Sequence, residues 1–234
     1  MVFGLGGYGG VAAPWTDPAF YYIRNAKSGT QQLFGTAIGV PAAGWWGVDR
    51  GSNTNVQNQL KLLLSSTDAE KAIGLLGTDF ADSERANLRA LAYQARGQSC
   101  AYWPDSTPFA RDKTNVRDGH YDIWGPVHFY TRVGSGGTPS DAASALVTRF
   151  AAPKLDQGLI QIITEKSLVP KCAMYVQRTE EVGPLQRYTT DSPCHCFFEQ
   201  VANGKTECQT CTLPGECPKD RPICSYGYCE APQQ

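Results

Sequence analysis

Hydrophobic positions in the first quarter of the chain change from a continuous run to a helical period within a few residues. Residues 20–24 are aromatic or β-branched with one arginine, a pattern that predicts a short strand. Apolar residues between positions 33 and 38 then recur at helical spacing. Ser28 or Thr30 supplies a suitable N-cap for that helix. The sequence therefore predicts a strand, a tight loop and a helix in this order.

The same alternation continues along the next 130 residues. Periodicity predicts a helix over 54–66, a short buried strand over 72–77, a strand over 121–132 broken by Gly125-Pro126, and helices over 140–151 and 156–167. Asp156 is a candidate N-cap of the last helix, and residues 86–95 fit either a short helix or an extended segment. Strands that alternate with helices indicate an α/β domain.

From about residue 179 the apolar content falls and cysteines become frequent, so we place a domain boundary between 1–178 and 179–234. Eight of the nine cysteines follow position 171, and Cys100 is left over. A short segment this rich in cysteine is typical of a disulfide-stapled module, although Cys-x-x-Cys beside His195 keeps zinc as an alternative. The disulfide candidates are Cys172, Cys194, Cys196, Cys208, Cys211, Cys217, Cys224 and Cys229.

Charge and composition exclude several classes of function. The formal net charge is −1 and no basic stripe is present, so we expect no nucleic-acid partner. Apolar runs end before the length that spans a bilayer, and the residues after Met1 do not form a signal peptide. The cysteines nevertheless predict a periplasmic, cell-surface or secreted protein. We therefore expect the natural N-terminus to lie upstream of Met1.

The segment Arg24–Thr30 carries the most promising chemistry, because a strand delivers it to the start of a helix. The first N–H groups of a helix lack partners and its dipole favours an anion. Ser28 and Thr30 add hydroxyl donors, Gly29 allows close approach of the backbone, and Arg24 offers a fork of N–H donors. These four residues form a candidate anion site. An ordinary capped helix beside a solvated Arg24 is the alternative interpretation.

Arg-x-x-x-Ser-Gly-Thr after a strand resembles the ligand loop of phosphate-binding periplasmic proteins, which have a type II binding-protein fold. Further segments are similar to that family in the same order, over roughly residues 1–178: Trp15-Thr16-Asp17-Pro18, Ala72–Leu76, Asp118–Trp124 and Leu168-Val169-Pro170. The resemblance implies an incomplete type II binding-protein fold, followed by the small disulfide-rich module. It also implies an extracytoplasmic solute-binding protein for phosphate uptake, without a cofactor or enzyme activity.

Two departures from that family qualify the expectation. Phosphate-specific members usually carry an acidic residue two positions before the serine, and here that position is Ala26. The first lobe of the family fold has no counterpart in this sequence, so we expect the isolated chain to bind oxyanions weakly or not at all. The expected partners are a phosphate-like oxyanion and a membrane component of an ABC transporter. A surface structural or interaction protein that uses its tail to bind a partner is the alternative function.

Other motifs give weaker predictions. Gly4–Gly9 formally matches a dinucleotide-binding glycine pattern, but no strand precedes it. A triad of Ser28, His120 and Asp118 is conceivable, although the nucleophile elbow of hydrolases is missing. Asp79 and Asp82 fit either a cleft wall or helix caps. A solvated face is the expectation for a set of basic residues, namely Arg85, Arg89, Arg96 and Lys113.

Overall fold

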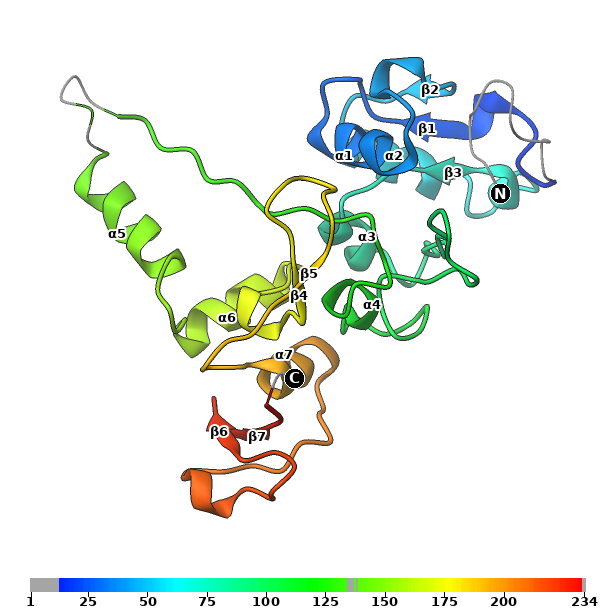
Figure 1. Ribbon diagram of the computed structural model, residues 1–234. Helices are drawn as coiled ribbons and strands as arrows, with labels where there is room; N and C mark the ends of the chain where they lie inside the picture. The colour runs from blue at the N-terminus through cyan, green and yellow to red at the C-terminus, as the bar shows by residue number, and fades with distance from the viewer. Residues whose placement is uncertain (1–12, 134–136, 138, 233–234) are drawn as a thin grey trace.

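The computed structural model describes residues 13–133, 137 and 139–232, and its elements follow the predicted alternation of strands and helices (Figure 1). The glycine pattern at Gly4–Gly9 lies outside the described residues. The strands are β1 (Tyr21–Ile23), β2 (Val48–Asp49), β3 (Ile73–Gly74), β4 (Val176–Gln177), β5 (Gln186–Arg187), β6 (Ile223–Ser225) and β7 (Tyr228–Glu230). The α-helices are α1 (Gly29–Ile38), α2 (Asn53–Leu62), α3 (Thr78–Ser83), α4 (Thr114–Arg117), α5 (Asp141–Phe150), α6 (Gln157–Glu165) and α7 (His195–Asn203). Short 3-10 helices are η1 (Pro18–Phe20), η2 (Ala42–Gly44), η3 (Ala69–Lys71), η4 (Lys171–Ala173) and η5 (Pro214–Glu216).

The first three strands form a parallel sheet in the order β2-β1-β3, with α2 packed against β1 and β3 (Figure 1). Tyr22 pairs with Val48 on one side of β1 and with Gly74 on the other. Tyr21 and Tyr22 are buried, and Val56 of α2 is fully buried beneath them. Parallel strands connected by helices are the α/β arrangement that the sequence predicts. These contacts establish a mixed α/β protein with small sheets.

Both helices of this region begin and end at residues of the expected type. Ser52 caps α2 by accepting a hydrogen bond from the Asn55 N–H at 3.1 Å. Helix α1 ends at Gly39, whose φ of 71° is the left-handed conformation that glycine adopts without steric cost. Asp156 caps α6 in the predicted way and accepts from the Leu159 N–H at 2.8 Å. Local capping chemistry therefore explains where α2 and α6 start and where α1 ends.

The predicted strand over 121–132 is wrong. The chain between these positions is extended but pairs with no neighbouring strand, and it crosses the molecule toward α5 (Figure 1). Gly125-Pro126 interrupts the ladder that a strand would need, because proline donates no backbone hydrogen bond. Val127, Phe129 and Tyr130 are more than half exposed. The prediction was based on the apolar composition of this segment, but a strand also needs a neighbouring strand with which to pair.

All eight cysteines after position 171 form disulfides, which confirms their predicted pairing state. The pairs are Cys172–Cys194, Cys196–Cys208, Cys211–Cys224 and Cys217–Cys229. Cys100 is free and exposed. Cross-links of this density compensate for a small core, because each typically contributes about 2–4 kcal/mol of stability.

The cysteine-rich tail shares a hydrophobic core with the preceding helices. Ile160 of α6 and Ala173 of η4 are fully buried, and they cluster with Phe198 of α7 and with Tyr226. The disulfide between Cys172 and Cys194 also joins residues on both sides of position 179. The predicted boundary therefore falls inside a covalently closed loop, while the separation into 1–178 and 179–234 stays a prediction.

Arg117 at the end of α4 connects the middle of the chain to the tail. Its side chain is almost fully buried, and its Nε donates to the Ala173 carbonyl at 2.8 Å. One terminal nitrogen, Nη1, donates to the Asp112 carbonyl and forms an ion pair of 3.1 Å with Glu199. The other, Nη2, lies 3.0 Å from Nδ1 of His195. One guanidinium of α4 thus bonds to the segment just before α4, to η4 and to α7.

His195 completes this arrangement as a neutral ring. Burial, and then the positive charge of Arg117, lower the pKa of His195 to about 3. The uncharged ring stacks on Tyr175 with 4.0 Å between centroids, while the Arg117 guanidinium lies 5.0 Å from the centroid of the Phe198 ring. Because an arginine stays protonated, Nδ1 of His195 accepts this hydrogen bond. The histidine named in the alternative zinc interpretation therefore has a structural role here.

We predict that Arg117→Met lowers the free energy of unfolding by about 3 kcal/mol or more, because it strands several buried acceptors. Chemical denaturation of the oxidised protein measures the change. Arg149→Met is the matched control, since its ion pair with Asp156 is exposed and is expected to contribute less than about 1 kcal/mol. Equal effects of the two substitutions would show that Arg117 does not link the tail to the rest.

Glu230 gives the tail a pH-dependent stability. Burial, with a smaller contribution from Glu199, raises the pKa of Glu230 from 4.5 to about 7, although the Cys196 N–H bonds to its carboxylate at 2.8 Å. A raised folded-state pKa means that the folded state holds the proton more tightly than the unfolded state does. Its stabilising effect is complete below about pH 4.5 and is lost as the pH rises through about 7.

We therefore predict that Glu230→Gln stabilises the protein above pH 7 by up to about 3 kcal/mol, because the amide keeps the hydrogen bond without a charge. At about pH 4 the variant and the parent should unfold at the same denaturant concentration. The exposed Glu165→Gln is the control and should shift neither value. A gain that does not depend on pH would contradict this assignment.

Candidate functional site

The predicted anion site lies at the carboxyl edge of the parallel sheet, where the loops after β1, β2 and β3 meet. Parallel strands bring the loops that follow them to one edge, and this is where α/β proteins commonly bind ligands. The loops lead into α1, α2 and α3, so three helices begin beside one another. The geometry thus places the segment that the sequence singled out at the end of β1, among the starts of these helices.

Arg24 connects the loop after β1 to the loop after β2 by hydrogen bonds. Its Nε donates to the Gly51 carbonyl at 3.3 Å, and its Nη1 donates to Oδ1 of Asn53. The same Asn53 oxygen accepts from the Gly77 N–H at 3.0 Å, which adds the third loop. Asn25 reinforces the contact by donating to the Gly51 carbonyl at 3.1 Å. Arg24 therefore shapes the site and holds a positive charge at the edge of the sheet.

The hydroxyl group of Ser28 is buried in this loop without a hydrogen-bond partner in the protein. It is the N-cap of α1 and is only 8% exposed, yet its hydroxyl makes no capping bond. Within the described part of the chain this buried oxygen has no hydrogen-bond partner at all. Buried polar groups in native proteins are nearly always paired with protein, water or ligand. A small polar ligand at this helix start would supply the partner.

Gly29 and Thr30 border an open cleft, whereas Arg24 and Ser28 lie behind its surface. A Cβ atom placed on Gly29 would meet no atom within 4 Å, so the fold itself does not require glycine at this position. The open space above Gly29 leaves room for a ligand next to the first N–H groups of α1. Sequence reasoning could name all four residues because they lie within one short segment, 24–30.

Asp79 was predicted only as a cleft-wall or capping candidate, and the structure places it in the cleft near Arg24. It lies in the first turn of α3, and its charge opposes the lowering of the Arg24 pKa that burial causes. An acidic group therefore reaches this site from the first turn of α3, although Ala26 occupies the position where the resemblance implies one. Only the fold brings positions 24 and 79 together, so no local motif could reveal it.

The cleft is larger than a site for one small anion. Its volume is about 2120 Å³, and it extends from the sheet past the segment 123–132 to α5, with mainly apolar walls. Typical small-molecule pockets measure about 300–1,000 Å³. The polar edge near Gly29 and Thr30 is thus one corner of a wider apolar hollow.

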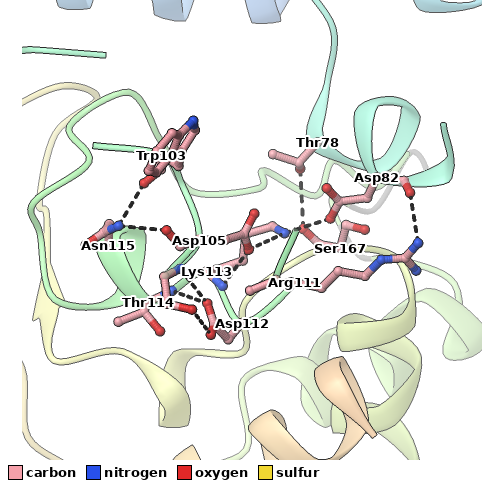
Figure 2. A network of polar contacts seen from close by, with 12 residues as sticks. Thr78, Asp82, Trp103, Asp105, Arg111, Asp112, Lys113, Thr114, Asn115 and Ser167 are labelled. Carbon is pink, nitrogen blue, oxygen red and sulfur yellow. Dashed lines mark hydrogen bonds and ion pairs between the residues drawn. The ribbon is translucent and has the colours of Figure 1, made fainter. Parts of the chain in front are cut away.

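A buried ion network lies beside α3 (Figure 2). It corrects the prediction of a solvated face for Arg85 and Lys113, whereas Arg89 and Arg96 are exposed as predicted. The ammonium group of Lys113 is 2.7 Å from an Asp82 oxygen and 2.9 Å from an Asp105 oxygen. Arg85 bonds to the same two carboxylates. All four side chains are at most 11% exposed. Lys113 therefore pairs with Asp82, a residue 31 positions away in the sequence.

This network is neutral and internally satisfied, so it explains rigidity better than chemistry. Burial alone would raise the pKa of Asp82, but the charges and hydrogen bonds of Lys113 and Arg85 hold it below its usual value. Lys113 adopts the left-handed conformation with φ 47°, and its N–H also donates to Asp105 at 2.8 Å. The four groups fix α3, the loop around 105 and the start of α4 relative to one another.

The hydrolase alternative finds no geometric support. His120 lies 2.9 Å from Asp118 and stacks on Tyr102 with 4.8 Å between ring centroids. Since no described residue bonds to the Ser28 hydroxyl, His120 is not positioned to activate it. The three residues of the imagined triad therefore do not form one relay.

We predict that Lys113→Met lowers the free energy of unfolding by about 3–5 kcal/mol, because two buried carboxylates would then share a single arginine. Lys61→Met is the control: the Lys61–Glu84 pair lies at the surface and should contribute much less to stability than the buried network does. Urea titration of both variants gives the comparison. A Lys113 variant as stable as the control would contradict the proposed role of the network.

Comparison with protein-family models, with curated proteins and with solved structures found no match to this chain. The residues themselves therefore carry the functional argument. Within the described ranges, no helix combines the length and apolar character needed to cross a bilayer. The four disulfides are compatible with an extracellular environment.

Proposed function

We propose that this chain is an extracytoplasmic, non-enzymatic solute-binding protein that takes up a small oxyanion at the start of α1. The unpartnered Ser28 hydroxyl is the observation that carries the proposal. Its burial at a helix N-terminus places a hydrogen-bond donor where the helix dipole already favours negative charge. The resemblance to phosphate-binding periplasmic proteins and their type II fold supports the same ligand class.

The neighbouring groups supply the remaining donors. Gly29 and Thr30 contribute backbone N–H groups of the first turn, which have no carbonyl partner within the helix. Arg24 lies one loop behind them and adds positive potential, since a guanidinium remains charged at any physiological pH. An oxyanion in this corner would accept from Ser28 and from the backbone together. The site would then bind the anion mainly through neutral donors.

Asp79 suggests how a phosphate could be distinguished from a sulfate. A protonated phosphate oxygen can donate a hydrogen bond to a carboxylate, whereas a fully ionised sulfate meets only repulsion. Asp79 stands near Arg24 and borders the same cleft. The resemblance implies an acidic residue at position 26 that accepts a hydrogen bond from protonated phosphate. We propose that Asp79 has this role in place of Ala26. The carboxylate would therefore favour a singly or doubly ionised phosphate.

The affinity of the isolated chain should be low. Hydrogen bonds to a charged group contribute about 1.5–3 kcal/mol each, and association itself costs several kcal/mol. Three or four such bonds leave roughly 4 kcal/mol, which corresponds to a dissociation constant near 1 mM. An ABC transporter component or a surface partner that covers the cleft would raise this affinity by excluding water.

We predict that phosphate shifts the amide resonances of Gly29, Thr30 and Gln31 in a two-dimensional NMR titration, with a dissociation constant of about 1 mM. Ser28→Ala should weaken binding by about tenfold, because one bond to a charged ligand is lost. Gly29→Ala should leave the fold intact while hindering close approach, since its new methyl group meets only open space. Lys61→Ala, which removes a positive charge elsewhere on α2, serves as the control and should bind normally.

Sulfate should bind more weakly than phosphate to the parent protein and about equally well to Asp79→Asn. Shifts confined to other residues, or equal binding by Ser28→Ala and the parent, would overturn the site. No shifts at tens of millimolar phosphate would show that the start of α1 in this chain alone is not an oxyanion site.

The second candidate function is a surface interaction protein, and the exposed segment 126–133 favours it. Val127, Phe129, Tyr130 and Val133 are each more than half exposed, and the first three border the apolar cleft. Contiguous apolar surface of this kind commonly marks a protein–protein contact. If phosphate does not bind in the titration above, this segment and the tail become the leading candidates for the functional surface.

A further inference from the structure

Arg178, which directly follows β4, is a buried cation whose hydrogen bonding is incomplete. Its side chain is only 1% exposed. Nη1 donates to the backbone carbonyls of Asp122 at 2.9 Å and of Trp124 at 2.7 Å, and Nη2 donates to Oδ1 of Asp122. A guanidinium has five N–H donors. The Nε donor is buried and finds no acceptor among the described residues.

Trp124 adds a second unpaired donor beside the first. Its indole Nε1 is buried and likewise has no hydrogen-bond partner in the described part of the chain. The central carbon of the Arg178 guanidinium lies 4.6 Å from the centroid of the Trp124 ring, so the two side chains are in contact. Buried donors of this kind are nearly always paired in native proteins. Two donors in adjoining side chains, one of them charged, therefore point to one missing acceptor.

The charge of Arg178 is also incompletely balanced. Burial lowers the pKa of Arg178, and the negative charge of Asp122 offsets this effect only in part. Burial would also lower the pKa of Arg85, but Asp105 and Asp82 raise it above its ordinary value. A further negative group beside Arg178 would supply the balance that Arg85 already has.

Both residues border the large cleft, at the start of a long apolar wall. From Trp124 the extended chain runs along the cleft toward α5 (Figure 1). Phe129 packs on Phe150 of α5 with 4.6 Å between ring centroids. Five extended residues span about 17 Å, which is the length of wall between Trp124 and Phe129. Further apolar side chains of this wall are Val127, Leu146 and Val147.

We propose that the cleft binds a long-chain fatty acid, whose carboxylate accepts hydrogen bonds from Arg178 and Trp124 and whose acyl chain lies along residues 125–129 toward α5. A carboxylate is a strong acceptor for a guanidinium and brings the missing negative charge. An inorganic anion would satisfy the donors but leave the apolar wall in water, whereas an acyl chain covers it. This site shares no residue with the oxyanion site at 24–30, so the two proposals are independent.

The test uses the full oxidised chain and palmitate labelled with ¹³C at its carboxyl carbon, kept below its aggregation concentration. Titration followed by NMR should give saturable binding and a carboxyl resonance distinct from that of free palmitate. Fatty acids with shorter chains should bind more weakly, by up to about fourfold for each methylene removed. Methyl palmitate should bind at least about tenfold more weakly than the acid, because it lacks the charge.

Trp124→Phe tests the head-group contact, because it keeps an aromatic ring against Arg178 and removes only the N–H donor. It should weaken palmitate binding by about tenfold. Trp103→Phe is the matched control, since Trp103 does not line the cleft, and it should bind palmitate as the parent does. A change at Trp124 is preferred to one at Arg178, which also holds the backbone carbonyls at 122 and 124.

Three results would each overturn the fatty-acid site: no saturable binding of palmitate, equal affinity for the acid and its methyl ester, or the same affinity in the Trp124 and Trp103 variants. The phosphate titration separates this site from the one at α1. Palmitate binding without phosphate shifts at Gly29 and Thr30 would remove only the oxyanion proposal. Phosphate shifts there without palmitate binding would remove only the fatty-acid proposal.

Discussion

The buried guanidinium of Arg117 is the contact on which the rest of the arrangement depends. It satisfies backbone carbonyls of two separate segments and pairs with Glu199 and His195 in the first turns of α7. A charge this deeply buried is costly unless every donor finds an acceptor. The geometry of α4, η4 and α7 is therefore fixed jointly, because a shift of any one of them would leave a donor unpaired.

Polar groups in this protein fall into two kinds that have different consequences. The Arg85–Lys113 network and the Arg117 cluster are saturated with partners, so they specify position and leave little capacity for a ligand. Ser28 is buried to a similar degree but lacks a partner among the described residues. Ser28 is one of several buried groups without a partner, and its position at the N-terminus of α1 is the reason for proposing a ligand there.

Sequence patterns predicted the elements whose causes are local. The capped helices near Ser52 and Asp156 and the first strands follow from residue type and periodicity, and the cysteines after position 171 pair as their density indicated. Long-range pairing escaped prediction: nothing near Lys113 in sequence shows that Asp82 lies beside it. The extended segment 121–132 has the composition of a strand but no partner, and strand pairing is a property of two segments. Arg24–Thr30 could be named because it is one short segment, whereas Asp79 could be named only as a cleft-wall or capping residue, since nothing local in the sequence places it near Arg24.

The unpaired crossing between Gly125 and Arg132 has a consequence for how the chain tolerates cutting. Extended backbone without a ladder fits readily into a protease active site, so limited digestion should begin there. Every disulfide lies on the carboxyl side of such a cut, and none spans it. Arg117 and the Asp122–Arg178 ion pair would remain as bonds between the fragments. A nicked molecule would accordingly persist as a complex of two complementary fragments whose lifetime is set by these buried arginines.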